Sequence, residues 1–225
     1  MINIKQLSKN YGTNSVLKDI NIDFETGNVY GIVGENGAGK TTFFNCLSGI
    51  EKYKGEIHSV KNLKDTIGFL QTEFHFFPKI TGREYIQFLL NAREVKITNI
   101  GERNIFNLPL DKYAVNYSTG MKKKLALTAI LLQENSVYIL DEPFNGVDIQ
   151  SNIVITEIIH ELKRRNKLVI ISSHIFSTLS TTCDEIHVLE KGSFTKKVMK
   201  EDFEALESEM KAKTLLNTID RLGLK

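Results

Sequence analysis

The sequence predicts an α/β fold built around a parallel β-sheet, to which antiparallel strands and a helical insertion are added. Short runs rich in Val, Ile, Leu and Tyr alternate along the chain with longer stretches of helical spacing. Strands that are apolar on both faces are typical of parallel sheets, because helices cover both sides of such a sheet. Between about residues 72 and 135 this alternation stops, which indicates an inserted helical unit.

Two kinds of strand are predicted from the periodicity. INIKQL near the start and LKDINIDF at 17–24 alternate apolar and polar residues, as half-exposed antiparallel strands do. Continuous apolar runs predict buried strands at 29–33, 136–140, 167–172 and 185–190. KGS at 191–193 suits a tight turn into a last strand, FTKKVM.

Helical spacing follows the first three buried strands. The predicted helices lie at 39–50, 149–165 and 175–183. A further helix is predicted in the tail, where Phe203, Leu206 and Met210 have helical spacing. We expect this helix to pack on the core.

The insertion contains two predicted helices. TGRE has the form of a capping box, with Thr81 at the N-cap and Glu84 three residues later. A second helix is expected to start at Ser118, whereas the polar segment 92–116 is not assigned. The phenylalanines of FHFFP at 74–78 leave two interpretations open, an exposed docking patch or part of the core.

Composition limits the classes of function. A net charge of +2 gives no indication of a nucleic-acid partner or of an anionic membrane surface. The lysine run at 122–124 and KRR at 163–165 are predicted to lie on exposed helix faces. Cys46 and Cys183 have no metal-ligand spacing, which favours a reducing compartment. MINIKQLSKNYG has no apolar signal region, and no run approaches the length of a membrane span.

GENGAGKT at 34–41 fits the pattern G-x-x-x-x-G-K-[ST] of a phosphate-binding loop, between a predicted strand and a predicted helix. Its glycines let backbone N–H groups turn inward around phosphate oxygens, and the helix that opens at Gly39 adds its positive dipole end. We expect Lys40 to reach the β- and γ-phosphates and Thr41 to supply a hydroxyl to Mg²⁺. The predicted phosphate-binding residues are Gly34, Glu35, Asn36, Gly37, Ala38, Gly39, Lys40, Thr41 and Thr42.

Polar side chains follow two other buried strands at their carboxyl ends, where ligands of parallel sheets bind. SVYILDE ends in Asp141 and Glu142, and KLVIISSH ends in His174. Asp141 is expected to hold Mg²⁺, directly or through a water. Glu142 is placed to orient or deprotonate an attacking water, and His174 to donate a hydrogen bond to the γ-phosphate. A purely structural role is the alternative for each residue. The acidic residues could cap a helix, and the histidine could make its hydrogen bonds at the end of the strand.

Together these residues resemble the nucleotide-binding subunit of an ABC transporter, over roughly residues 1–198. YSTGM at 117–121 is similar to the family signature LSGGQ, with Ser118 and Gly120 retained and Thr119 at the middle glycine. The resemblance implies a P-loop NTPase of the ABC-ATPase fold, in which a parallel core sheet carries an antiparallel β subdomain and a short helical subdomain.

The resemblance also implies the domain organisation. A single ABC ATPase domain is expected over 1–225. Within it, the α/β core with its antiparallel strands is predicted at 1–71 and 136–198, the helical subdomain at 72–135 and a C-terminal helical tail at 199–225.

Further site residues follow from the resemblance. Ser118 and Gly120 would bind ATP held by a second ABC ATPase subunit, so that two subunits close head-to-tail over two nucleotides. Asp148, in DEPFNGVD at 141–148, would bridge the two subunits. Tyr11 matches the aromatic residue that stacks on adenine, and His174 matches the switch histidine. The sequence does not decide between a homodimer and a heterodimer.

One segment departs from the family pattern. In IGFLQTEF, Gln71 stands where the family has a proline, and Thr72 stands at the usual acid or amide position. If the loop shifts by one residue, Gln71 still reaches Mg²⁺, and we predict Gln71 as a metal ligand on that basis.

The resemblance implies an ATP-binding and ATP-hydrolysing subunit, with ATP and Mg²⁺ as cofactors, that drives transport through separate transmembrane permease subunits. The form of the YSTGM and DEPFNGVD motifs favours export as the direction of transport, and import stays open as the alternative direction. The expected location is the cytoplasm, on the inner face of the cell membrane through the permease. The alternative is a soluble ABC ATPase for cofactor assembly or regulation. A phosphate-loop kinase is disfavoured, because it needs an acceptor-binding lid and has no use for YSTGM.

Overall fold

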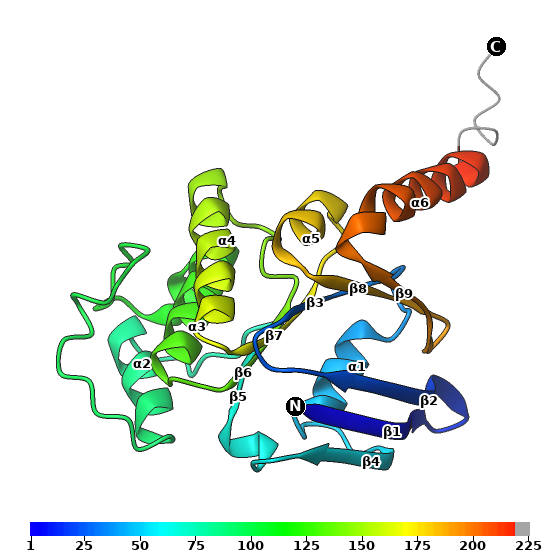
Figure 1. Cartoon of the computed structure of the whole chain (residues 1–225). Helices are drawn as coiled ribbons and strands as arrows, with labels where there is room; N and C mark the ends of the chain where they lie inside the picture. Colours follow the sequence, from blue (N-terminus) through cyan, green and yellow to red (C-terminus); the bar gives the residue numbers. More distant parts are fainter. Residues whose placement is uncertain (219–225) are drawn as a thin grey trace.

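A computed structural model describes residues 1–218, with side chains in the last helix described as far as Ala212. Its centre is a six-stranded sheet in the order β5-β6-β7-β3-β8-β9 (Figure 1). The strands are β3 (Val29–Val33), β5 (Ile67–Leu70), β6 (Val137–Asp141), β7 (Leu168–Ser172), β8 (Glu185–Glu190) and β9 (Ser193–Met199). All neighbours pair in parallel except β8 and β9. The prediction of an α/β fold with a parallel core sheet is confirmed.

A second sheet has three antiparallel strands in the order β2-β1-β4. They are β1 (Ile2–Tyr11), β2 (Asn14–Phe24) and β4 (Lys54–Ser59). The antiparallel prediction for the first two is confirmed. Neither β4 nor β5 was predicted. The β4 sequence, KGEIHS, has a single large apolar residue, and its conformation comes from pairing with β1 rather than from its own pattern.

Alternate side chains of the central strands enter two different cores. Val29 and Val33 of β3 face one hydrophobic cluster, and Tyr30 and Ile32 face the other. The first cluster includes side chains of α3 (Thr119–Leu132), α4 (Ile149–Arg164), α5 (Phe176–Thr182) and α6 (Phe203–Thr218). The second holds α1 (Lys40–Leu47) and the inner face of the three-stranded sheet. Helices therefore cover both faces, which explains the continuous apolar runs.

The tail helix packs as predicted over its described side chains. Phe203 and Leu206 are buried in the first cluster, and Met210 packs against it. The predicted tail at 199–225 continues into residues 219–225, which lie outside the described part of the chain.

The helical insertion forms a third cluster of its own. The predicted capping box is confirmed at the start of α2 (Gly82–Asn91): the Glu84 amide donates to Thr81 Oγ1 at 3.2 Å, and the Thr81 amide donates to Glu84 Oε2 at 2.8 Å. Segment 92–116 is mostly irregular, with a short 3-10 turn at Ala114–Asn116. The domain boundaries at 71 and 136 stay a prediction.

The phenylalanines of FHFFP divide between the core and the surface, and a docking role for the exposed one stays a prediction. Phe74 and Phe76 pack against the first and third clusters. Phe77 is 64% exposed and meets Phe88, 52% exposed, edge to face with ring centroids 6.1 Å apart. Two exposed aromatic rings therefore lie together on the surface of the insertion.

Cys46 and Cys183 are both buried and free. Burial raises the pKa of Cys46 to about 11 and that of Cys183 to about 12, so both stay protonated near neutral pH. Within residues 1–218, no helix combines the length and the apolar character needed to cross a membrane.

Candidate functional site

The predicted phosphate loop joins β3 to α1 and borders a cavity of about 410 Å³. Gly39 precedes α1 with φ 110°, a left-handed conformation that glycine adopts without strain. A Cβ on Gly34 would lie 2.3 Å from the backbone oxygen of Leu189, so glycine is required there for close packing. The cavity is lined by Val16, Asn36, Gly37, Gly39, Lys40, Thr41, Thr42, Thr72, Asp141 and Glu142.

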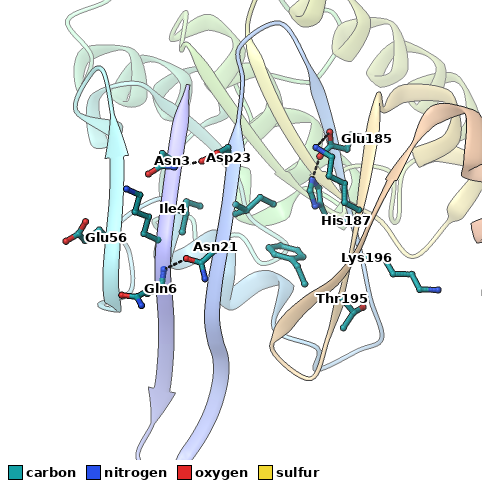
Figure 2. A pocket seen from close by; sticks show the side chains of 14 residues that line it. Asn3, Ile4, Gln6, Asn21, Asp23, Glu56, Glu185, His187, Thr195 and Lys196 are labelled. Carbon is teal, nitrogen blue, oxygen red and sulfur yellow. Dashed lines mark hydrogen bonds and ion pairs between the residues drawn. The ribbon is translucent and has the colours of Figure 1, made fainter.

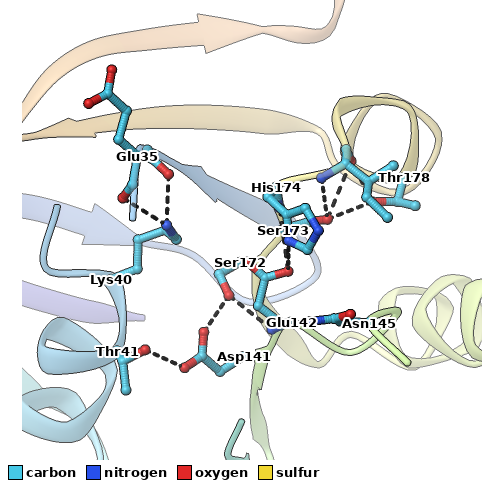
Figure 3. Close-up of polar contacts among 12 residues, drawn as sticks. Glu35, Lys40, Thr41, Asp141, Glu142, Asn145, Ser172, Ser173, His174 and Thr178 are labelled. Carbon is cyan, nitrogen blue, oxygen red and sulfur yellow. Dashed lines mark hydrogen bonds and ion pairs between the residues drawn. The ribbon is translucent and has the colours of Figure 1, made fainter. Parts of the chain in front are cut away.

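Lys40 folds back over the loop that precedes it. Its ammonium group donates to the backbone oxygens of Gly34 at 2.7 Å and of Glu35 at 3.2 Å (Figure 3). A flexible lysine held only by loop carbonyls can exchange them for a phosphate oxygen. The cation therefore lies in the wall of the cavity, where it could meet a phosphate.

Asp141 lies at the end of β6 and links two other elements. Its Oδ2 accepts a hydrogen bond from Thr41 Oγ1 at 2.7 Å, and its Oδ1 accepts one from Ser172 Oγ at 2.5 Å (Figure 3). Burial raises the pKa of Asp141, while these two hydrogen bonds and the charge of Lys40 act in the opposite direction. A hydroxyl and a carboxylate in contact beside a phosphate loop fit Mg²⁺, which takes oxygen ligands and is usually held by one or two carboxylates plus phosphates.

Glu142 follows β6 in a left-handed conformation, φ 52°, that is uncommon for a residue other than glycine. Its amide donates to Ser172 Oγ at 3.0 Å, and its Oε2 lies 2.8 Å from His174 Nδ1. The backbone turn therefore aims the carboxylate away from Asp141 and toward the histidine (Figure 3). Five predicted site residues lie together beyond the carboxyl ends of the parallel strands, as predicted. They are Lys40, Thr41, Asp141, Glu142 and His174.

The signature segment begins α3 close to the turn that follows Glu142. Ser118 is the N-cap and accepts a hydrogen bond from the Met121 amide at 3.2 Å, as predicted. A Cβ on Gly120 would lie 2.6 Å from the backbone oxygen of Gly146. The close approach of these two segments therefore requires glycine at position 120.

Asp148 is the N-cap of α4. Its carboxylate accepts hydrogen bonds from the Ser151 amide at 2.9 Å and the Ser151 hydroxyl at 2.8 Å, and Lys124 Nζ lies 3.1 Å away. These contacts, the Ser151 amide first, hold the pKa of Asp148 well below its usual range. Its predicted role between subunits stays a prediction.

Tyr11 is 45% exposed and does not line the cavity. Lys9 Nζ lies 4.6 Å from the centre of its ring. Burial raises the pKa of Tyr11, and a hydrogen bond with the Thr42 hydroxyl opposes this. Thr72, rather than Gln71, lines the cavity, so the metal contact of Gln71 stays a prediction.

Two residues of the site were missed. Ser172 joins Asp141 to Glu142, and its polar side chain at the end of a buried strand was the available signal. Lys123 was predicted on an exposed helix face, and this is wrong: it is 4% exposed. Its spacing of four and seven residues from the buried Leu127 and Ile130 indicates the buried face of α3.

A larger cavity, of about 820 Å³, lies between the three-stranded sheet and the β8–β9 hairpin (Figure 2). Glu185 and His187 point toward each other in its wall, with Oε1 and Nε2 2.5 Å apart. Burial lowers the pKa of His187. Among the described residues, the lining of this cavity includes none of the predicted site residues, whereas several of them line the smaller cavity.

Comparison with known proteins identifies the family of this chain. A family model described as ABC transporter matches residues 17–145. The ATP-binding protein NatA of Bacillus subtilis is 31% identical, with 78% of each chain covered. The bacitracin transport ATP-binding protein BcrA of Bacillus licheniformis is 32% identical, covering 88% of this chain and 69% of the relative.

A solved dimeric structure of an ATP-binding cassette with ADP and Pi is 19% identical, with a TM-score of 0.80 over 89% of this chain and 99% of that chain. At 19% sequence identity, this structural similarity supports the fold alone.

Replacing Ser172 by alanine is expected to lower the free energy of unfolding by about 1–3 kcal/mol, because a buried carboxylate oxygen and the Glu142 amide both lose their partner. Urea denaturation measures the change. The matched control is Ser180→Ala, whose hydroxyl donates only to the Ser177 carbonyl of the preceding helical turn. Equal midpoints for both variants would contradict the role given to Ser172.

Proposed function

The chain belongs to the ABC transporter family as an ATP-binding and ATP-hydrolysing subunit, and from this premise we propose how its own residues divide that work. The observation that carries the proposal is the meeting of four side chains at one sheet edge: Thr41 with Asp141, and Glu142 with His174. The first pair suits a metal–phosphate site, and the second suits activation of a water.

Nucleotide binding is assigned to the phosphate loop. The backbone N–H groups of residues 34–42 would surround the phosphates, and Lys40 would exchange the carbonyls of Gly34 and Glu35 for β- and γ-phosphate oxygens. Thr41 and Asp141 would hold Mg²⁺, with Gln71 as a further ligand. A metal held by these residues would supply positive charge to offset that of the phosphates. Tyr11 would stack on adenine.

Hydrolysis is assigned to Glu142, with His174 as its partner. The Glu142 carboxylate would take the proton of the attacking water, or orient it. His174 holds Glu142 Oε2 through Nδ1, and its ring is more than half exposed. Its Nε2 would then be free to donate to the γ-phosphate.

The assembly is proposed to be a head-to-tail pair. Ser118 and Gly120 lie at the amino end of α3, where free N–H groups and the helix dipole favour a phosphate of the second subunit. Asp148 lies nearby and would contact the second subunit. A dimeric cassette with the same fold supports this arrangement.

The membrane partner is proposed to be a separate transmembrane permease, with export as the direction of transport. Relatives named for bacitracin transport support a role in transport. The exposed pair Phe77 and Phe88 supplies an apolar contact on the insertion for such a partner. The chain would then be cytoplasmic, on the inner face of the membrane.

Replacing Glu142 by glutamine is expected to leave ATP affinity unchanged and to lower kcat by about 100-fold or more, because the amide cannot accept the proton. Steady-state phosphate release and equilibrium ATP binding measure the two effects, and gel filtration with ATP tests for a trapped dimer. Glu157→Gln, on the exposed face of α4, is the matched control. Parental turnover in Glu142→Gln would remove Glu142 from the role of base.

Replacing Lys40 by alanine is expected to abolish detectable ATP binding, because the contact with the β- and γ-phosphates is lost. Fluorescent-nucleotide titration measures affinity, with Lys61→Ala as an exposed control of the same chemistry. Normal affinity in Lys40→Ala would contradict the phosphate-loop assignment.

The partner is tested by isolating the tagged protein from gently solubilised membranes. We expect a multi-span membrane protein in fixed stoichiometry, and reduced recovery with Phe77→Ser while ATPase activity is retained. Recovery of a soluble protein with nothing membrane-bound would favour the alternative, an assembly or regulatory ATPase.

A further inference from the structure

Lys123 is a buried cation in the first half of α3, and its immediate partners are carbonyl groups rather than carboxylates. Its Nζ donates to the backbone oxygen of Glu142 at 2.5 Å and to that of Asn145 at 2.7 Å. Removing an ammonium group from water is costly unless hydrogen bonds compensate it. A lysine buried in this way therefore indicates that the segment it binds has to be held in one conformation.

That segment is the turn 142–146, which has unusual backbone geometry. Glu142 has φ 52° and Gly146 has φ 73°, both left-handed. The turn makes one internal hydrogen bond of its own, from the Asn145 amide to the Glu142 oxygen at 3.2 Å. Strained conformations persist where the surroundings over-determine them. Lys123 closes the turn by binding its first and fourth carbonyls together.

The same contact completes the support of Glu142. Its amide is held by Ser172, its side chain by His174, and its carbonyl by Lys123. Ser172 belongs to β7 and His174 follows it, so Lys123 is the member of this set that comes from another element, α3. Loss of Lys123 leaves Glu142 bound to Ser172 and His174, and leaves the turn with only its internal hydrogen bond from the Asn145 amide.

We propose that Lys123 is a positioning residue for ATP hydrolysis: by fixing the turn 142–146 it sets the direction of the Glu142 carboxylate without touching the nucleotide. This inference rests on the proposed function of Glu142. The inference predicts an effect on the rate of hydrolysis rather than on ATP affinity. Lys123 binds the turn and not the phosphate loop, which is proposed to bind the nucleotide.

The charge on Lys123 gives the effect a pH dependence. Burial lowers its pKa to about 8, and the carboxylates of Glu142 and Asp141, the charged groups that act on it from β6 and the following turn, oppose this. Lys122 and Lys124 are the cations on its own helix. Below pH 8 the charged form makes strong hydrogen bonds to both carbonyls, and above it the neutral amine makes weaker ones. The positioning effect is therefore lost as pH rises through about 8.

The test compares ATP hydrolysis and ATP binding by the full chain in three variants. Lys123→Met retains the apolar stem and is expected to lower kcat by about 10- to 100-fold with ATP affinity near that of the parent, as misplacement of a catalytic group does. Lys122→Met, the matched change at the neighbouring, partly exposed lysine, is expected to match the parent. Parental kcat in Lys123→Met, or equal loss of kcat and of affinity, would overturn the proposal.

Lys123→Arg keeps the charge at every pH and decides the question even where Lys123→Met fails to fold. Its kcat relative to the parent is expected to rise between about pH 7 and pH 9.5, because only the parent loses its proton there. A flat ratio would contradict the proposal. If the parent itself hydrolyses no ATP the proposed function fails, whereas an active parent with an equally active Lys123→Met refutes this inference alone.

Discussion

The hydrogen bonds of the Asp141 carboxylate, one to Thr41 and one to Ser172, are the interaction on which the site depends. They join the start of α1, the end of β6 and the end of β7, which lie far apart in the sequence. Parallel pairing brings these ends together, with Asp141 opposite Ser172 in the register. A shift of either strand by one residue would turn one of these side chains to the other face of the sheet. The two-sided core therefore holds the strands in the one register that assembles the site.

The site carries costs that the rest of the domain has to offset. A carboxylate and an ammonium group, Asp141 and Lys123, are both buried, and Glu142 has a backbone conformation that few side chains tolerate. Burial shifts the pKa of each of these two buried groups toward the neutral form. Each nonetheless makes two hydrogen bonds, Asp141 with two hydroxyl groups and Lys123 with two backbone carbonyls. Such an arrangement is poorly explained by stability alone, and well explained by a need to fix catalytic groups before substrate arrives.

Much of this could be predicted from the sequence, for physical reasons that differ between elements. VYGIV and EIHVLE form strands at their predicted bounds because two-sided burial leaves a dense apolar pattern. The capping box at Thr81 is equally local, since all its hydrogen bonds lie within one turn. By contrast, β4 has almost no apolar pattern and exists through its pairing with β1, so local reasoning missed it. The prediction for the lysine run was wrong for Lys123, because it gave more weight to the charge of the side chain than to its helical spacing. That spacing places Lys123 on the buried face.

The helix α3 connects the proposed contact with a second subunit to the proposed catalytic residue of its own chain. Its first residues, Ser118 and Gly120, are proposed to bind the nucleotide of a second subunit, while Lys123 and Lys124 one turn later bind the turn after Glu142 and the cap of α4. Gly120 itself lies against the Gly146 carbonyl. Any displacement of α3 on closing over the second nucleotide would therefore move the catalytic turn of its own chain. In a head-to-tail pair this relation would hold in both directions, so that the position of α3 would couple the two sites.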